Sequence, residues 1–150
     1  MVQRKIIDEF FASKKFAVVG VSRNEKKFGN AVFKELKAKG YDVFPVNSKS
    51  EFINGEKCYN NLESLPEKVD GVVVVVPPQE AEKVVREAEA ANIKRVWLQQ
   101  GSQSDEVINF CVEKGINVVY GECILMFAEP VKSFHKIHRG FKKIFGRLPK

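Results

Sequence analysis

The hydrophobic positions of this chain alternate between short continuous runs and longer segments with helical spacing. Five runs predict strands: residues 15–21, 41–47, 71–78, 94–101 and 116–121. Short continuous apolar runs are typical of strands that are buried on both faces of a parallel sheet. The five successive valines at 72–76 are the clearest case, because valine is favoured in strands.

Segments with helical periodicity connect these runs. Apolar residues recur every three to four positions after the first strand (Phe28, Val32, Phe33, Leu36) and after the third (Ala81, Val84, Val85, Ala88). Gly40 is placed to end the first of these helices. Residues 104–115 predict another helix, with Ser104 as its N-cap and Gly115 at its end. A helix over 3–13 and a helical turn over 62–68 complete the prediction.

Strands that alternate with helices predict an α/β fold, because parallel neighbours need a crossover helix between them. We expect a Rossmann-like, doubly wound parallel sheet of five strands in the order 3-2-1-4-5. Ligands of such sheets bind outside the carboxyl ends of the strands, at the switch point beside the first strand. The loops at 20–29, 46–50, 76–79, 98–103 and 121–124 are therefore predicted to face one crevice.

Composition and charge divide the chain into a body and a tail. With 150 residues and 44% hydrophobic positions, the chain can bury the core of a single domain, which we place at residues 1–130. The net charge is +6, yet residues 131–150 hold seven basic and no acidic side chains. The remaining 18 basic and 19 acidic side chains leave residues 1–130 with a net charge of −1.

The cysteines and the hydropathy pattern predict a cytoplasmic protein. Cys58, Cys111 and Cys123 are odd in number and have no paired spacing, which favours reduced thiols. The chain has no C-x-x-C pair, so a zinc site is not predicted. It also lacks an apolar run of the roughly 18 residues that a membrane span needs.

The first loop has the composition of an anion-binding turn. A helix that begins near Phe28 offers unpaired backbone N–H groups at Phe28, Gly29 and Asn30 together with a partial positive charge. Gly29 is expected to let a phosphate approach the backbone. The side chains of Ser22, Arg23, Lys26 and Lys27 add donors and charge. The plain alternative is that these cations are solvated surface and that Gly20 only serves a tight turn.

The other loops favour an adenine nucleotide that carries a phosphate on its ribose. Sites for NAD usually have an acid at the end of the second strand, where this chain has Asn47, Ser48 and Lys49. A lysine attracts a ribose phosphate, which points to coenzyme A (3′-phosphate) or NADP (2′-phosphate). Flat Pro77 and Pro78 suit one face of an adenine. Further along the chain, polar groups able to bind an amide chain occur at Gln99, Gln100 and Ser102.

Four stretches, read together, resemble a known family. "AVVGVSRNEKKFGNAVFKELKAKGYDVFPVN", "VVVVVPP", "VWLQQGSQSDE" and "GINVVYGECILM" are similar, in that order, to the CoA-binding domain proteins. These proteins are small stand-alone relatives of the N-terminal domain of the succinyl-CoA synthetase alpha subunit. The resemblance covers roughly residues 10–128, and it implies a Rossmann-like fold that binds coenzyme A through its 3′-phospho-ADP and pantetheine parts.

The resemblance also implies a set of binding residues, which agrees with the set read from the loops. The phosphate turn falls on Gly20, Val21, Ser22, Arg23, Lys27, Phe28 and Gly29. The basic residue after the second strand falls on Lys49, and the segment after the fourth strand falls on Leu98, Gln99, Gln100 and Gly101. The loops themselves add Asn47, Val76, Pro77 and Pro78 to the predicted cofactor-binding set. The chain departs from the family at Val46-Asn47-Ser48, where V-N-P is common.

Catalysis is not implied. The phosphorylated histidine of the related synthetase lies in a second domain, and neither His135 nor His138 corresponds to it. No Ser-His-Asp order, paired carboxylates or metal cluster falls in the predicted crevice. We therefore expect a non-catalytic CoA or acyl-CoA binding protein with a regulatory or accessory role. The alternatives are an NADP-dependent oxidoreductase and an interaction protein that acts through its tail.

The tail predicts a basic amphipathic helix. Its apolar positions recur every three to four residues at Val131, Phe134, Ile137, Phe141, Ile144, Phe145 and Leu148. Such a helix can dock on its own domain, on a second copy in a homodimer or on a partner enzyme. Its cations and phenylalanines also suit an anionic membrane surface. Nucleic acid is disfavoured because residues 1–130 carry no excess of basic side chains.

Overall fold

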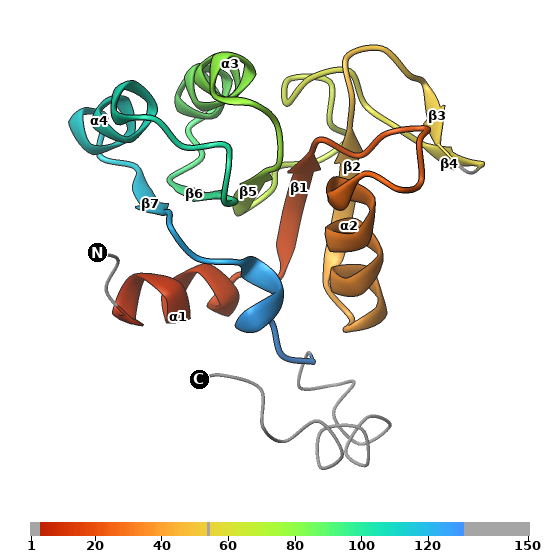
Figure 1. The fold of residues 1–150 in the computed structure, drawn as a ribbon, viewed down its shortest axis with the longest axis horizontal. Coiled ribbons are helices and arrows are strands. Elements are labelled where there is room, and N and C mark those ends of the chain that lie inside the picture. The colour runs from red at the N-terminus through yellow and green to blue at the C-terminus, as the bar shows by residue number, and fades with distance from the viewer. Residues whose placement is uncertain (1–3, 54, 131–150) are drawn as a thin grey trace.

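The computed structural model describes residues 4–53 and 55–130, and these form an α/β fold built on a five-stranded parallel sheet (Figure 1). The sheet contains β1 (Lys15–Val19), β2 (Asp42–Val46), β5 (Gly71–Val74), β6 (Arg95–Leu98) and β7 (Asn117–Val119). Its helices are α1 (Arg4–Ala12), α2 (Phe28–Ala38), α3 (Pro78–Ala90) and α4 (Asp105–Glu113). A hairpin of β3 (Phe52–Ile53) and β4 (Glu56–Lys57) and a 3-10 turn, η1 (Ile124–Met126), complete the elements.

The predicted strand order is wrong. The observed order is β2-β1-β5-β6-β7, which corresponds to 2-1-3-4-5 when the five predicted strands are numbered along the chain. The valine-rich β5 pairs with β1 on the side away from β2, and all four pairs in the sheet are parallel. The order reverses between β1 and β5, so the switch point still lies beside the first strand, as predicted.

Pro45 explains why β2 lies at the edge of the sheet. Asp42 N–H donates to Lys14 and Val46 C=O accepts from Gly20, so alternate residues of β2 bond to the β1 side. Pro45 belongs to the other set, so its backbone nitrogen faces away from β1 and its missing N–H breaks no pair with that strand. On the side of β2 away from β1, Tyr59 forms an isolated parallel bridge with Val46, and its N–H donates to Pro45 O at 2.9 Å.

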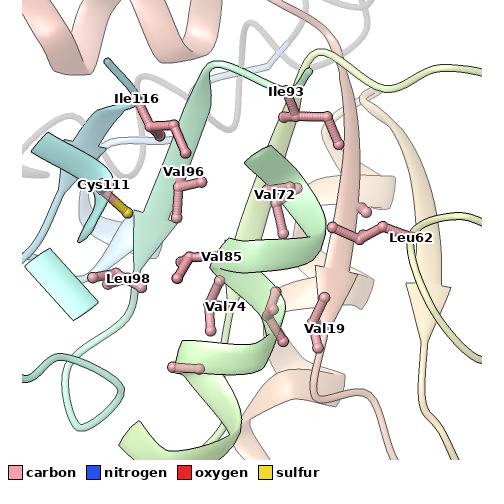
Figure 2. Close-up of a cluster of buried hydrophobic side chains, with 14 of the residues drawn as sticks. Val19, Leu62, Val72, Val74, Val85, Ile93, Val96, Leu98, Cys111 and Ile116 are labelled. Atoms are coloured by element: carbon pink, nitrogen blue, oxygen red, sulfur yellow. The ribbon is translucent and has the colours of Figure 1, made fainter. Parts of the chain in front are cut away.

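Two hydrophobic clusters cover the two faces of the sheet. On one face, Phe16 and Val18 of β1 pack with α1, α2 and η1, and Phe10 stacks on Phe16 with ring centroids 4.7 Å apart. On the other face, Ala17 and Val19 of β1 pack with α3 and α4. Figure 2 shows this second cluster, in which valines of β5 and β6 meet Val85 and Cys111. Burial on both faces accounts for the continuous apolar runs in the sequence.

The helix boundaries agree with the capping signals. Helix α2 begins at Phe28 as predicted, and Gly40 follows its end with φ +95°. The Ser104 hydroxyl oxygen accepts from Val107 N–H at 3.2 Å, so Ser104 caps α4, and Gly115 follows the end of that helix. The helical turn predicted over 62–68 is absent, because those residues form turns and bends. The tail predicted as a helix, residues 131–150, lies outside the described residues.

The last described residues lie where the parallel strands begin, at the end of the sheet opposite the predicted crevice. Lys39 Nζ donates to Ala128 O at 3.0 Å, and Tyr41 Oη donates to Glu129 O at 2.7 Å. Both contacts lie where α2 ends and β2 begins, and the carboxyl ends of the parallel strands lie at the other edge.

Candidate functional site

The loops at the carboxyl ends of β1 and β2 are joined by direct hydrogen bonds. Gly20 N–H donates to Val46 O at 3.2 Å, and Asn47 Nδ2 donates to Val21 O at 2.7 Å. In addition, the Asn47 carboxamide oxygen accepts from Lys49 N–H at 2.7 Å. The first two predicted loops therefore form one connected surface.

The loops after β5, β6 and β7 continue the same edge. Val76 N–H donates to Ser102 Oγ at 3.0 Å, and Ser102 Oγ donates to Val74 O at 3.1 Å. The side-chain oxygen of Gln99 accepts from Ile124 N–H at 3.0 Å, while that of Gln103 accepts from Gly121 N–H at 2.9 Å. Hydrogen bonds thus link the loop after each strand to its neighbour, apart from the junction between β1 and β5.

Backbone contact closes that remaining junction. A Cβ on Gly20 would lie 2.2 Å from Val75 O, and Val75 N–H donates to Val19 O at 2.8 Å. The five loops predicted to face one crevice are therefore neighbours along one edge of the sheet. Figure 1 shows the first of them leaving the arrowhead of β1 and returning to the start of α2.

Side chains of the first turn shape the turn itself. The Ser22 hydroxyl oxygen accepts from Asn24 N–H at 3.0 Å, and Asn24 Oδ1 accepts from Lys26 N–H at 3.1 Å. Such local bonds from Ser and Asn are typical of turns. The Ser22 hydroxyl thus accepts within the loop, while its O–H proton has no acceptor among the described residues and Ser22 stays a predicted ligand donor.

Helix α2 begins without a side-chain cap. Lys27 occupies the N-cap position and provides no capping hydrogen bond. The N–H groups of Phe28 and Gly29 have no acceptor in the described part of the chain, whereas Asn30 N–H donates to Lys27 O at 3.1 Å. The predicted free donors are therefore present at Phe28 and Gly29 but not at Asn30. They lie at the positive end of the helix dipole.

The two glycines of the turn have a packing role. A Cβ on Gly29 would lie 2.3 Å from Gly20 O, a distance that real Cβ atoms do not show. Gly29 therefore lets the start of α2 press against the end of β1, and its missing side chain faces the backbone rather than an open phosphate path. Gly20 has φ +122°, a conformation that favours glycine. Close packing against Gly20, and not a path for a phosphate, therefore accounts for Gly29, and Gly20 serves a tight turn.

The charged side chains around this turn are exposed cations. Arg23, Lys26, Lys27 and Lys49 are exposed, and none has an acidic side chain within ion-pair distance among residues 4–53 and 55–130. Glu25, the acid within the turn, pairs with Lys34 at 3.8 Å. The edge therefore presents positive charge beside the uncapped end of α2.

The predicted residues after β5 and β6 have mixed surroundings. Pro77 is the N-cap of α3 and Pro78 its first residue, with Pro77 exposed and Val76 and Pro78 half-buried. Leu98 is fully buried in the cluster of Figure 2, and Val21 is buried in the opposite cluster, so each offers the crevice only its backbone. Gln100 and Gly101 are exposed.

Gln99 has a free amide nitrogen at this edge. The side chain is 2% exposed and its oxygen is bonded to Ile124 N–H. Its Nε2 has no hydrogen-bond partner in the part of the chain that the structure describes. This nitrogen is also not completely shielded from solvent. It therefore remains accessible to a hydrogen-bond acceptor outside the protein. Ser102, by contrast, is 2% exposed and its hydroxyl already joins two loops.

A cavity of about 340 Å³ is lined by residues of α2, of β2 and of the β3–β4 hairpin. Its apolar wall includes Val21, Phe33 and Ile53, and the ion pair between Lys37 and Glu56, 2.8 Å long, joins α2 to the hairpin beside it. No residue of the loops after β5, β6 or β7 lines it. Of the predicted binding residues, Val21 lines this cavity, and Asn30 lies beside it in the cavity wall.

The described cysteines are free thiols in different surroundings. Burial raises the pKa of Cys58 and raises that of Cys111 to about 11. Cys123, in the loop after β7, is half-buried.

Among residues 4–53 and 55–130, no group of three His, Cys, Asp or Glu side chains could hold a metal ion. The helices of the same ranges lack the length and hydrophobicity to cross a bilayer.

Sequence reasoning missed two parts of this edge. The side chain of Asn30 is buried and bonds twice to the backbone of Ser22, at 2.8 and 2.7 Å. A polar residue on the otherwise apolar face of α2, beside Phe33 and Leu36, was the available signal. The hairpin β3–β4 was also missed, although the Asn54-Gly55 dipeptide between its strands is a strong hairpin signal.

Comparison with known families gives one match over most of the chain. The model of the CoA binding domain family matches residues 14–129. That range contains all five strands of the sheet and every loop of the carboxyl edge.

Individual relatives are of two kinds. The acetate–CoA ligase [ADP-forming] II subunit alpha of Pyrococcus furiosus is 28% identical over 130 residues, which are 79% of this chain but 28% of the subunit. The chain thus spans little more than a quarter of that relative. An uncharacterized protein, YneT of Bacillus subtilis, is 30% identical over 112 residues, which are 75% of this chain and 83% of YneT.

A solved structure of a smaller protein has the same fold. A conserved hypothetical protein from Pyrococcus furiosus superposes with a TM-score of 0.73 at 40% identity. The match covers 77% of this chain and 99% of that protein. The fold described above therefore also occurs as a small separate protein.

Proposed function

Because this chain belongs to the CoA-binding domain family, we propose that it binds coenzyme A or an acyl-CoA at the carboxyl edge of its sheet without turnover. Residues 1–130 form the Rossmann-like binding domain in this proposal. The ligand is held through its 3′-phospho-ADP and pantetheine parts. NADP is the competing ligand, because it too carries a phosphate on its ribose.

The uncapped start of α2 is the observation that carries the proposal. The unpaired N–H groups of Phe28 and Gly29 and the helix dipole favour an anion at this point. Exposed Arg23 and Lys27 add positive charge on the same turn. We assign the pyrophosphate of the cofactor to this position.

The loop after β2 supports a ligand with a further phosphate. Residues 47–50 contain no acid, and the backbone of Lys49 is held by Asn47 at 2.7 Å. We assign the 3′-phosphate to Lys49, because an exposed ammonium group attracts a phosphate dianion. Pro77 and Pro78, at the start of α3, are assigned to one face of the adenine.

The loop after β6 supports a polar chain that runs along the edge. Gln99 Nε2 is free to donate, and its oxygen is held by Ile124 N–H at 3.0 Å, which orients the amide. Pantetheine has two amide carbonyls that can accept such a bond. Exposed Gln100 and Gly101 flank the same path.

An accessory role without catalysis is the form of the proposal that fits the residues at this edge. Both histidines of the sequence lie beyond residue 130, so the described residues provide no imidazole base. We assign no side chain at this edge as a general base for the Cys123 thiol. The resemblance to a ligase subunit supports a role beside a partner enzyme, with this chain presenting or sensing the cofactor.

Thermal shift measurements with CoA, dephospho-CoA, NADP and buffer test this function. A ligand at 100 times its dissociation constant stabilises the folded state by about 2.7 kcal/mol, which raises the melting temperature by several degrees. We expect the largest shift with CoA and a smaller one with dephospho-CoA. A larger shift with NADP would favour the oxidoreductase alternative, and no shift with any ligand would refute nucleotide binding at this edge.

A further inference from the structure

Asn30 is a buried polar side chain that forms hydrogen bonds to both backbone polar groups of one residue in the phosphate turn. It is 2% exposed, and its Oδ1 accepts from Ser22 N–H at 2.8 Å while its Nδ2 donates to Ser22 O at 2.7 Å. Both polar atoms of the amide are therefore used on the backbone of Ser22. A buried amide satisfied in this way fixes the backbone that it contacts.

The orientation of the next peptide unit follows from this contact. The chain has no cis peptide bond among the described residues, so the Ser22 carbonyl and the Arg23 N–H point in opposite directions across one planar unit. Because Ser22 O faces the Asn30 side chain, Arg23 N–H points to the opposite side of this unit, away from that side chain. It has no acceptor in the described part of the chain.

Asn47 does the same for the preceding carbonyl. Its Nδ2 donates to Val21 O at 2.7 Å, and its Oδ1 accepts from Lys49 N–H at the same distance. Two successive carbonyls of the turn, at Val21 and Ser22, are thus each held by an asparagine side chain. The same contacts join the turn to the loop that carries Lys49.

We propose that Asn30 and Asn47 are positioning residues, which hold these two carbonyls in place so that Arg23 N–H is presented to the pyrophosphate of the ligand. This inference rests on the proposed function, and it explains how the backbone of the anion site is oriented before the ligand binds. Without Asn30, the unit between Ser22 and Arg23 can rotate and turn a carbonyl oxygen toward the phosphate. That oxygen repels the anion where the N–H would bind it.

The arrangement predicts that Asn30 and Lys49 affect the affinities for CoA and dephospho-CoA differently. The pyrophosphate is common to CoA and dephospho-CoA, so removing Asn30 should weaken both ligands by the same factor. Loss of a hydrogen bond to a charged group corresponds to about 10- to 100-fold in affinity. Lys49, assigned to the 3′-phosphate, should instead discriminate between the two ligands.

Isothermal titration calorimetry on the full chain with both ligands tests the proposal, using Asn30→Ala and two controls. Asn109→Ala removes an exposed asparagine of α4 and should leave the affinity unchanged. Val85→Ala removes core packing on the opposite face, so it lowers stability without touching the turn. We expect at least about a tenfold loss with Asn30→Ala alone, equal for CoA and dephospho-CoA.

A second measurement uses the unaltered protein, in case Asn30→Ala does not fold. In a ¹H–¹⁵N spectrum, addition of CoA should move the Arg23 amide proton downfield and slow its exchange with solvent. An Arg23 amide that does not respond to bound CoA overturns the inference, as does an Asn30→Ala variant with unchanged affinity. Loss of affinity in Val85→Ala equal to that in Asn30→Ala also overturns it. If the unaltered protein binds neither ligand, the proposed function itself fails and this inference with it.

Discussion

Gly29 and Gly20 approach so closely that a Cβ on Gly29 would lie 2.3 Å from the carbonyl oxygen of Gly20. The contact joins the first turn of α2 to the end of β1, where the proposed pyrophosphate site lies. We predict that Gly29→Ala lowers the free energy of unfolding by about 1–3 kcal/mol, because backbone atoms must move to admit the methyl group. The gain in helix propensity, about 1 kcal/mol at most, does not offset this. The variant should also lose CoA affinity.

Urea unfolding and calorimetry with CoA check this prediction, with Gly115→Ala as the control. A Cβ on Gly115 meets nothing within 4 Å, and its φ of +73° makes the cost one of backbone conformation only. We expect about 1–2 kcal/mol of destabilisation there without loss of CoA affinity. An affinity for CoA unchanged in Gly29→Ala would show that the close contact is not needed to shape the site.

Lys49 should recognise the phosphate that distinguishes CoA from dephospho-CoA. The side chain is exposed and has no acidic partner among the described residues. We predict that Lys49→Ala weakens CoA about tenfold and dephospho-CoA far less, because a charge-assisted contact is lost only with the former. The difference between the two ligands should shrink as salt is added, because the contact is exposed to solvent.

Titration of both ligands into Lys49→Ala gives the comparison, and Lys68→Ala is the matched control. Lys68 is an exposed lysine in the segment that leads into β5, at the end of the sheet where the strands begin. It should have no effect on either ligand. Equal weakening of CoA and dephospho-CoA by Lys49→Ala would remove this residue from the 3′-phosphate.

Local patterns predicted the elements well, whereas the order of the strands needed information from a single residue. Continuous apolar runs marked all five strands because each is buried on both faces. Periodicity cannot tell which strand is a neighbour of which, and the usual order placed β2 between two strands. Pro45 already argued against that placement, since a proline is tolerated where its missing N–H faces an edge.

The candidate site was predictable as a set of loops but not as a set of contacts. Carboxyl ends of parallel strands share one edge whatever their order, so the grouping held when the order failed. Which side chain faces a ligand depends on bonds within the protein. Ser102 looked like a ligand donor, yet its hydroxyl donates to Val74 O and accepts from Val76 N–H. Asn30 was predicted to offer its backbone N–H to an anion, yet its side chain holds the backbone of Ser22.

The three cysteines should react with alkylating reagents in an order set by burial. Cys111 is fully buried and its pKa is raised to about 11, so about one thiol in a thousand is ionised at pH 8. Cys58 is buried too, and its pKa is also raised. We predict that iodoacetamide modifies Cys123 first, with Cys58 and Cys111 reacting only when urea unfolds the chain. Peptide mass spectrometry at successive times measures the order, and early modification of Cys111 would contradict the packing around it.

Tyr41 should make the free energy of unfolding depend on pH in alkaline solution. Burial raises the pKa of its hydroxyl from 10.0 to about 12, and the hydroxyl donates to Glu129 O at 2.7 Å. Below pH 10 both the folded and the unfolded chain keep this proton, so its contribution to stability is complete. Between about pH 10 and 12 the unfolded chain loses the proton while the folded chain retains it, which lowers the free energy of unfolding.

Urea unfolding of the unaltered protein and of Tyr41→Phe from pH 8 to 12 isolates this contribution. At pH 8 the variant should be less stable by about 1 kcal/mol, because the hydrogen bond to the Glu129 carbonyl is lost. The difference should shrink as the pH rises and approach zero or change sign near pH 12, since a two-unit shift corresponds to about 2.7 kcal/mol. Tyr120→Phe, which leaves this contact intact, should keep the alkaline fall of the unaltered protein. Curves for the unaltered protein and Tyr41→Phe that stay parallel up to pH 12 would show that the Tyr41 hydroxyl ionises as readily in the folded chain as in the unfolded one.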